Sequence, residues 1–361
     1  MSPKVNKRVT KHNDLTEGSI QKSLVRMTLP MIIGMLMLFT FSIVDTLFIS
    51  FLGTESLSAI SFTFPVTFTI MSLAIGLGIG ASAVVGRCLG NAELKRAKEA
   101  ATVINYISFG LAVITVGICW FFMEDLFSLM GASESLMLLI REYMEVWFIG
   151  SVLVVCIMTG NSILRATGDT KTPSILMASA GLINAILDPL LIFGYGPFPE
   201  LGIQGAAWAT VIAWTVGFVY LMYLLAYKLE LVSRTLPSRA VMMSSGKDML
   251  RIGIPAAGAN MMTPVAAGIM TAVAASYGDA VVAGFGVGAR LEPIATLLIL
   301  AISSSLPPLV SQNFGASRID RIEEAYTMSL RFLLVWQLFV YALLGVGAGL
   351  IASIFSDDPE V

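Results

Sequence analysis

Two acidic residues lie within otherwise apolar stretches of this sequence. Asp45 interrupts the run 27–51, and Asp188 interrupts the run 173–195. A run of about 20 apolar residues is long enough to cross a bilayer. A charged side chain at bilayer depth costs roughly 2.5–3.5 kcal/mol on insertion scales, so both acids are candidate functional groups.

The two acids are expected at nearly the same depth. Asp45 lies eight residues before Gly53, and Asp188 lies six residues before Gly194. At 1.5 Å of helical rise per residue, these separations correspond to about 12 Å and 9 Å. Asn184 precedes Asp188 by one helical turn and shares its helix face. The spacing therefore predicts two carboxylates and an amide in one layer.

Such a layer is suited to binding a small ion. Two carboxylates held close together cannot both ionise readily, so the pair could bind and release protons. The same oxygens would also suit Na⁺. Tyr143 and Thr210 are expected about 10 Å and 12 Å below the same surface. We predict an ion-coupling or proton-coupling site at Asp45, Asn184, Asp188, Tyr143 and Thr210. The alternative interpretation is a buried Asp–Asn pair that only fixes helix packing.

A second polar pair lies in the apolar run 280–310. Arg290 and Glu292 are ten and twelve residues beyond Ala280. An arginine near the bilayer centre needs a partner or water. Residues two apart on a helix do not face each other, so the two side chains contact different neighbours. They predict either a cavity wall or a structural pair, and the sequence leaves both interpretations open.

Composition indicates a membrane protein that crosses the bilayer several times. Of the 361 residues, 56% are hydrophobic and 13% are charged. The mean hydropathy is +0.83. Soluble domains carry about 25% charged residues, so this chain is too apolar for that class. The net charge is −2 and the basic residues are scattered, which argues against nucleic-acid partners.

The sequence predicts no metal site, no disulfide, no cofactor and no catalytic residues. Cys88, Cys119 and Cys156 lie in or beside apolar segments without paired spacing, so we interpret them as small buried hydrophobic residues. His12, the one histidine, lies in a polar N-terminal tail without other ligands nearby. The only ion that we expect to bind is the coupling ion.

The chain contains nine apolar segments long enough for membrane helices, which predicts an all-α polytopic protein. They are 27–51, 57–86, 101–123, 136–164, 173–195, 202–227, 250–277, 280–310 and 326–353. Lys and Arg concentrate in the tail and in every second loop, whereas the alternate loops are acidic and carry only Arg141, at the edge of a segment. By the positive-inside rule, the N-terminus is cytoplasmic and the protein lies in the cell's inner (plasma) membrane.

The sequence repeats itself at an offset of 225 residues. RMTLP at 26–30 recurs as RIGIP at 251–255, and LGNAELKRAKEA at 89–100 recurs as FGASRIDRIEEA at 314–325. An even number of segments separates the copies, which predicts a parallel repeat with a substrate site between its halves. The counterpart of Asp45 is Met270, so the scaffold does not itself require an acid there.

This repeat divides the chain into four parts. We expect a cytoplasmic tail at 1–26, a first lobe of six helices at 27–227, a cytoplasmic linker at 228–249 and an incomplete second lobe of three helices at 250–361.

These motifs together resemble the multidrug and toxic compound extrusion (MATE) transporters. The resemblance rests on GSIQKSLVRMTLP, SIVDTLFISFLG, RATGDTKTP, NAILDP, GIQGAAWAT and the repeated RIGIP. The pairing of Asp45 with Asn184 and Asp188 resembles the branch related to the DinF proteins. The resemblance implies coupling at these first-lobe acids, together with a Tyr and a Thr that match Tyr143 and Thr210.

The resemblance also implies two six-helix lobes and export of organic cations against H⁺ or Na⁺. The sequence departs from the family pattern in two ways: the seventh segment carries no acid, and only nine of an expected twelve helices are present. We therefore expect no second-lobe cation site of the kind used by the sister branch.

The resulting hypothesis is a monomeric secondary antiporter that exports organic cations or amphipathic compounds in exchange for H⁺, with Na⁺ as the alternative ion. A flippase for lipid-linked precursors is a rival, although it would need a strongly cationic cavity. A non-transporting fragment and an intramembrane hydrolase with Asp45 and Asp188 as a dyad are further rivals. No other hydrolase motif is present, so we do not expect an enzyme.

Overall fold

All secondary-structure elements are helices in the part of the chain that the structure describes. The computed structural model describes residues 14–355 except 234, 236 and 278. Its elements are α1 (Ile20–Ser50), α2 (Thr54–Gly90), α3 (Leu94–Phe121), α4 (Met123–Leu129), α5 (Glu134–Ala166), α6 (Lys171–Ile192), α7 (Ile203–Tyr223), the π-helical turn η1 (Leu224–Lys228), α8 (Arg239–Ala275), α9 (Asp279–Gly315) and α10 (Ile319–Phe355).

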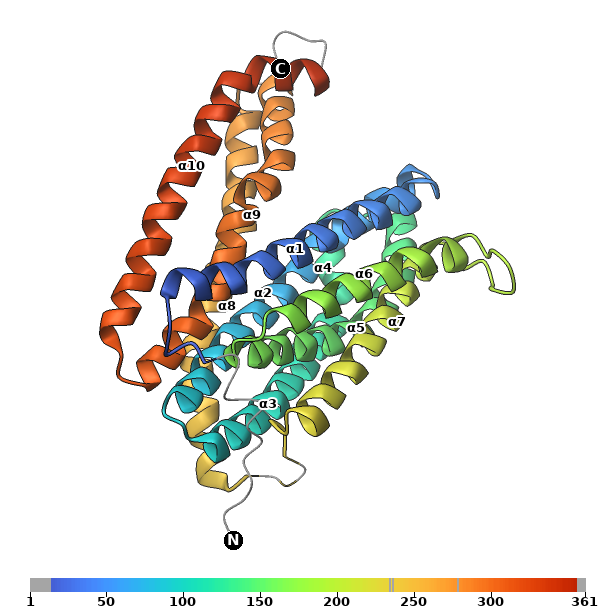
Figure 1. Ribbon diagram of the computed structural model, residues 1–361. Coiled ribbons are helices and arrows are strands. Elements are labelled where there is room, and N and C mark those ends of the chain that lie inside the picture. Colours follow the sequence, from blue (N-terminus) through green and yellow to red (C-terminus); the bar gives the residue numbers. More distant parts are fainter. Residues whose placement is uncertain (1–13, 234, 236, 278, 356–361) are drawn as a thin grey trace.

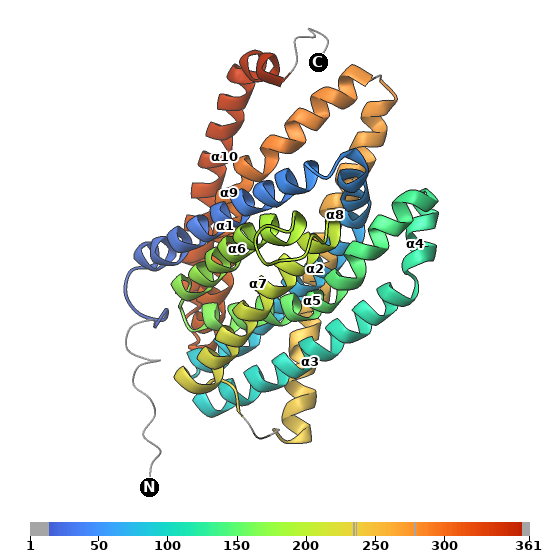
Figure 2. The same ribbon diagram turned by 90° about the vertical axis from the view of Figure 1, so that its right-hand side faces the viewer.

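Nine helical spans within these residues are long and apolar enough to cross a membrane. They correspond to the nine predicted segments and confirm the all-α fold. The short helix α4 was not predicted, and it occupies the connection between α3 and α5 (Figure 2). His12 lies outside the described residues.

The helices α1 to α7 of the predicted first lobe form a bundle built around α2 and α5. The helix α5 packs against α2, α3 and α7, while α6 packs against both α1 and α7. The helices α8, α9 and α10 lie in the predicted second lobe, and α9 and α10 rise beside the first-lobe bundle (Figure 1). Contacts of α2 with α8 and α9, and of α1 with α9, join the lobes.

The internal repeat is visible in backbone geometry. The turn after α2 places Ala92 at φ +57°, and the turn after α9 places Ser317 at φ +58°. Ala92 N–H donates to the carbonyl of Leu89 (2.9 Å), and Ser317 N–H donates in the same way to the carbonyl of Phe314 (3.1 Å). Both left-handed residues are non-glycine, an uncommon conformation that recurs at the offset of 225.

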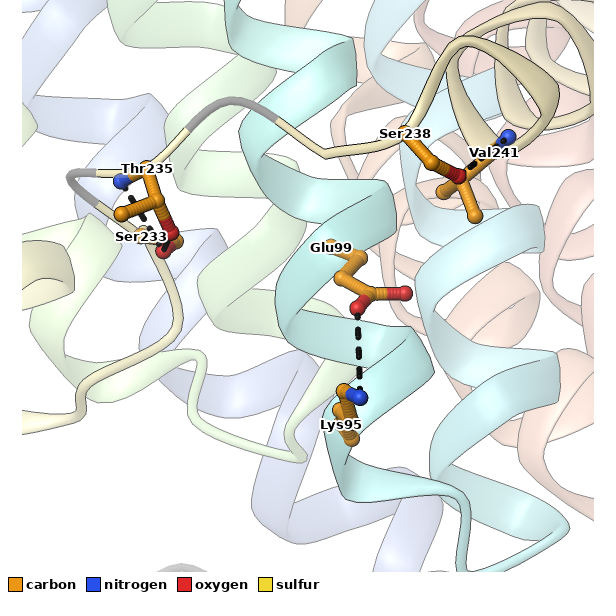
Figure 3. A network of polar contacts seen from close by, with 6 residues as sticks. All are labelled: Lys95, Glu99, Ser233, Thr235, Ser238 and Val241. Carbon is orange, nitrogen blue, oxygen red and sulfur yellow. Dashed lines mark hydrogen bonds and ion pairs between the residues drawn. The ribbon is translucent and has the colours of Figure 1, made fainter.

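The predicted linker 228–249 is partly helical. Ser238 accepts a hydrogen bond from Val241 N–H (3.5 Å), so it caps α8, which already begins at Arg239 (Figure 3). The preceding chain is fixed to α3 by a hydrogen bond from Ser233 N–H to Thr102 Oγ1 (2.8 Å). Apolar periodicity alone did not reveal this start because the polar stretch SSGKD at 244–248 separates the first turn of α8 from its long apolar run.

The lobes touch through backbone where α2 meets α9. A Cβ added to Gly90 would overlap the carbonyl of Gln312, and one added to Gly315 would overlap the carbonyl of Arg87. Glycine is needed at both positions because any side chain would force the two helices apart.

Next to this contact between α2 and α9, residues 14–19 form a segment that we call the N-terminal strap. Gln312 accepts from Leu15 N–H (3.0 Å) and donates to the carbonyl of Ala166 in the first lobe (2.7 Å). Asn313 donates to the carbonyl of Leu15 (3.0 Å), and Arg321 donates to the carbonyl of Gly18 (2.9 Å). The end of the tail is therefore an ordered tie between the lobes.

Candidate ion-coupling site

Close packing of α1 on α6 positions the two membrane acids. A Cβ added to Gly34 of α1 would lie 3.0 Å from Cβ of Ser174, and the ring of Phe41 lies directly against Gly181 of α6. These small residues let the helices approach closely along their length. Asp45 and Asp188 continue this contact face toward the ends of the two helices.

Asp188 is fully buried (0% exposed). The side-chain amide of Asn184 donates to Asp188 Oδ1 (3.1 Å) and lies 3.2 Å from Thr210 Oγ1, on α7. This arrangement joins α6 to α7 at the level of the acid. The hydrogen bond to an ionised carboxylate also fixes the orientation of the carboxyl group.

Asp45 faces Asp188 across the α1–α6 interface. Their carboxyl groups lie within hydrogen-bonding reach of each other. A hydrogen bond between two carboxyl groups requires a proton on one of them, because ionised carboxylates only accept. Asp45 Oδ1 and Asp188 Oδ2 are buried and have no other partner among the described residues. The pair thus has unused oxygen atoms that can receive a proton or a cation.

Tyr143 of α5 completes the surroundings of the pair. It is 8% exposed and close enough to Asp45 and Asp188 to interact electrostatically with both. The structure therefore brings together all five residues of the predicted site, from the four helices α1, α5, α6 and α7. Chemically, the arrangement can hold one shared proton, take up a second, or offer oxygen ligands to Na⁺.

The predicted second-lobe pair is not part of this cluster. Glu292 is exposed on α9, a helix that contributes nothing to the acid pair, and its backbone carbonyl accepts from Thr296 Oγ1 (2.7 Å). The side chain of Arg290 lies outside the described residues.

Two polar features were missed at the level of sequence. Asn161 of α5 is fully buried, and neither atom of its amide has a partner among the described residues. Gln312 and Asn313 hold the strap. The internal repeat could have revealed Gln312 and Asn313. Their counterparts 225 residues earlier are Arg87 and Cys88, so the two amides are not part of the repeated pattern.

Comparisons with known proteins agree with this architecture. The model of the MatE family matches residues 30–190 and 255–361. The FAD transporter of Shewanella oneidensis is 43% identical over 347 residues, which are 96% of this chain and 77% of that protein. The multidrug export protein MepA of Staphylococcus haemolyticus is 27% identical over 96% of this chain and 75% of its own length.

Solved structures show the same fold. The MATE transporter VcmN of Vibrio cholerae in its bent form has a TM-score of 0.88 and 31% identity, with 95% of this chain and 77% of that chain covered. A MOP superfamily transporter from Pyrococcus furiosus has a TM-score of 0.86 and 29% identity, with coverage of 97% and 77%.

The family match covers more than half of the sequence, and its two parts begin at the two prolines, Pro30 and Pro255, that mark the internal repeat. This chain therefore belongs to the MatE family: it is a multi-pass MATE transporter and not an enzyme.

Proposed function

We propose that this MATE transporter is a proton-coupled exporter in which Asp45 and Asp188 bind the coupling proton. The observation that carries the proposal is the pair of facing carboxyl groups with unpartnered buried oxygens. Asn184, Thr210 and Tyr143 orient the pair. Na⁺ is the alternative ion, because the same oxygens are suitable ligands for it.

The coupling mechanism is electrostatic. When both acids are ionised they repel each other, and the interface between α1 and α6 is favoured in an open arrangement. Protonation from outside removes the repulsion, draws α1 and α6 together and releases the substrate. Loss of the proton to the cytoplasm resets the protein. One protonation event thereby biases a helix bundle that has two stable arrangements.

For the substrate, we propose flavin adenine dinucleotide or a related aromatic dinucleotide. The support is the 43% identity to a protein named as an FAD transporter, over nearly the whole of this chain. This choice differs from the organic cations expected from the sequence, because FAD carries two phosphate charges.

Organic cations and other amphipathic drugs are the second candidate. Relatives named as multidrug exporters, at 27–28% identity, favour it. The finer placement in the DinF-related branch is also a proposal, supported by the association of Asp45 with Asn184 and Asp188. A lipid-precursor flippase and a fragment without transport activity are the remaining alternatives.

The proposal is tested in proteoliposomes with imposed ion gradients. We expect FAD to drive proton movement in the direction opposite to its own transport under a pH gradient, and no FAD transport under a Na⁺ gradient alone. Asp45→Asn should abolish the exchange, whereas Asp125→Asn, an exposed acid on α4, should leave it unchanged.

Three outcomes would redirect the proposal. Transport of a cationic dye but not of FAD would select the drug exporter. Transport driven by Na⁺ would select the other ion. Full exchange by the Asp45→Asn protein would remove the acid pair from the mechanism.

A further inference from the structure

An apolar cavity lies between the lobes, away from the acid pair. It has a volume of about 270 Å³ and is bounded by α1, α9 and α10. On α1, its lining includes Val25 and Leu29, which are each 57% exposed. In a membrane protein such exposed aliphatic side chains contact lipid, so the cavity communicates with the bilayer along α1.

Two hydroxyl groups in the lining have no partner. Thr28 on α1 is 7% exposed and Ser329 on α10 is 4% exposed. Their oxygens are buried and accept or donate no hydrogen bond among the described residues. A buried hydroxyl without a partner is unfavourable, so these two groups indicate a ligand that carries hydrogen-bond acceptors.

The internal repeat shows that helix geometry alone does not create this cavity. The counterpart of Thr28 is Gly253, where a Cβ would lie only 3.0 Å from the carbonyl oxygen of Gly76 on α2. The counterpart of Ser329 is Ile104, which is fully buried. The equivalent region between α8, α2 and α3 is thus closed by direct packing, whereas the region between α1, α9 and α10 is open and carries hydroxyls.

The depth of the hydroxyls matches that of lipid ester groups. Thr28 lies two residues beyond Arg26, at the beginning of the apolar run of α1. Ser329 lies three residues beyond the start of the apolar run 326–353 of α10. Both hydroxyls are therefore expected near the level at which the hydrocarbon core begins, where the ester groups of lipids lie.

We propose that this cavity binds one glycerophospholipid of the leaflet at which α1 begins. The hydroxyls of Thr28 and Ser329 donate to its ester carbonyls. One acyl chain occupies the apolar lining between α1 and α10, beside Ile32 and Phe332. The lipid then bridges the first lobe to the second. This proposal is independent of the coupling ion and of the exported substrate.

The first test measures bound lipid on the intact protein. The protein is reconstituted in nanodiscs with a phospholipid that carries a photoactivatable acyl chain, and the cross-linked peptides are identified by mass spectrometry. We expect cross-links in residues 25–32 and 325–332 of the unaltered protein. Cross-links spread evenly over the lipid-facing helices, without enrichment at these two stretches, would overturn the proposal.

The second test uses variants. Thr28→Val combined with Ser329→Ala removes both donors with little change in shape, and we expect roughly tenfold or greater loss of cross-linking at these stretches. Ser329→Ile, which copies the closed repeat, should do the same by filling the cavity. Thr327→Val removes an exposed hydroxyl of α10 and is the matched control, which should cross-link as the unaltered protein does.

Two results count against a lipid. Unchanged cross-linking in both cavity variants, with the proteins monodisperse, would show that the hydroxyls do not hold the ligand. Displacement of the photolipid by micromolar FAD or by a cationic dye would assign the cavity to the transported substrate. Failure of transport in proteoliposomes would not alter the cross-linking results. The lipid site and the proposed transport function are therefore tested separately.

Discussion

At the scale of single residues, the acid pair depends on Asn184 as much as on the acids. Its amide donates to Asp188, and it also contacts Thr210. An N–H group directed at a carboxylate favours the ionised form of that carboxylate. Asn184 therefore promotes the step in which the proton leaves.

Replacement of Asn184 by leucine should slow transport most strongly at neutral pH. The substitution keeps the volume but removes the donor, so the acid pair retains its proton to higher pH and the pH optimum moves upward. A hydrogen bond to a charged group is worth about 1.5–3 kcal/mol, which corresponds to a loss of about tenfold or more in rate. The measurement is the pH profile of exchange in proteoliposomes.

Asn260→Leu provides the control for this variant. Within the described part of the chain, Asn260 of α8 donates only to the carbonyl of Ala256 in its own helix (2.8 Å), so its replacement should leave the pH profile in place. An unshifted pH optimum in Asn184→Leu would mean that the amide serves packing alone.

At the scale of elements, the contact of α2 with α9 is set by backbone approach. Gly315→Ala introduces a methyl group where the carbonyl of Arg87 already lies. Overpacking of this kind typically costs about 1–3 kcal/mol. We expect a clear fall in the thermal unfolding midpoint in detergent, followed by intrinsic fluorescence.

Gly110→Ala on α3 is the matched change, because a Cβ there has nothing within 4 Å. It should be neutral or slightly stabilising, since alanine is favoured over glycine within helices by roughly 0.5–1 kcal/mol. Equal midpoints for the two variants would contradict the close approach of α2 and α9.

The N-terminal strap is the second element whose contacts can be tested. Gln312→Ala removes the hydrogen bonds that link Leu15 to Ala166, so the strap should detach more often. In a protein with Leu15→Cys as its sole cysteine, we expect thiol labelling to accelerate about fivefold, since the strap loses one hydrogen bond of about 1 kcal/mol.

Gln204→Ala, on α7, should not alter this labelling rate. If Gln312→Ala labels no faster than the control, the strap is held by its remaining contacts. These are the hydrogen bonds from Asn313 and Arg321 and the packing of fully buried Leu15 with Leu309 and Ala325.

At the scale of the whole molecule, the parallel repeat makes a prediction about sidedness. Asn91 and Ser317 lie in the equivalent turns after α2 and α9, so cysteines at both should react with an impermeant reagent from the same side. The positive-inside count predicts that this side is cytoplasmic. Labelling from opposite sides would refute the parallel arrangement.

Much of this molecule was predictable because helical rise converts sequence position into depth. Counting residues from Gly53 and Gly194 was sufficient to place Asp45 and Asp188 in one layer, and the offset of 225 located both copies of the turn. The packing of α1 on α6 then brings the helix faces that carry these two acids into contact. The family match supports the same fold.

The contacts of the strap and the start of α8 were not predictable in this way. The carbonyls of the strap accept hydrogen bonds from distant side chains, as in the bond from Asn313 to Leu15, which are 298 residues apart. Every residue has a backbone carbonyl, so the sequence does not show which carbonyl is bound. The helix α8 starts at a polar cap, Ser238, before its apolar run begins. Periodicity detects the buried face of a regular helix, and neither a hydrogen bond to a backbone carbonyl nor a polar helix cap changes that pattern.

The glycine contact between α2 and α9 also affects how fast the transporter can change conformation. Two backbones in direct contact have no layer of side chains that can shift to accommodate partial movement. The helices must part along their whole contact before that side of the molecule opens, so opening is a single collective step. Collective motions of this size take microseconds to milliseconds. The step is the same whichever compound is carried, so it sets one upper limit on turnover that no gain in substrate affinity can raise.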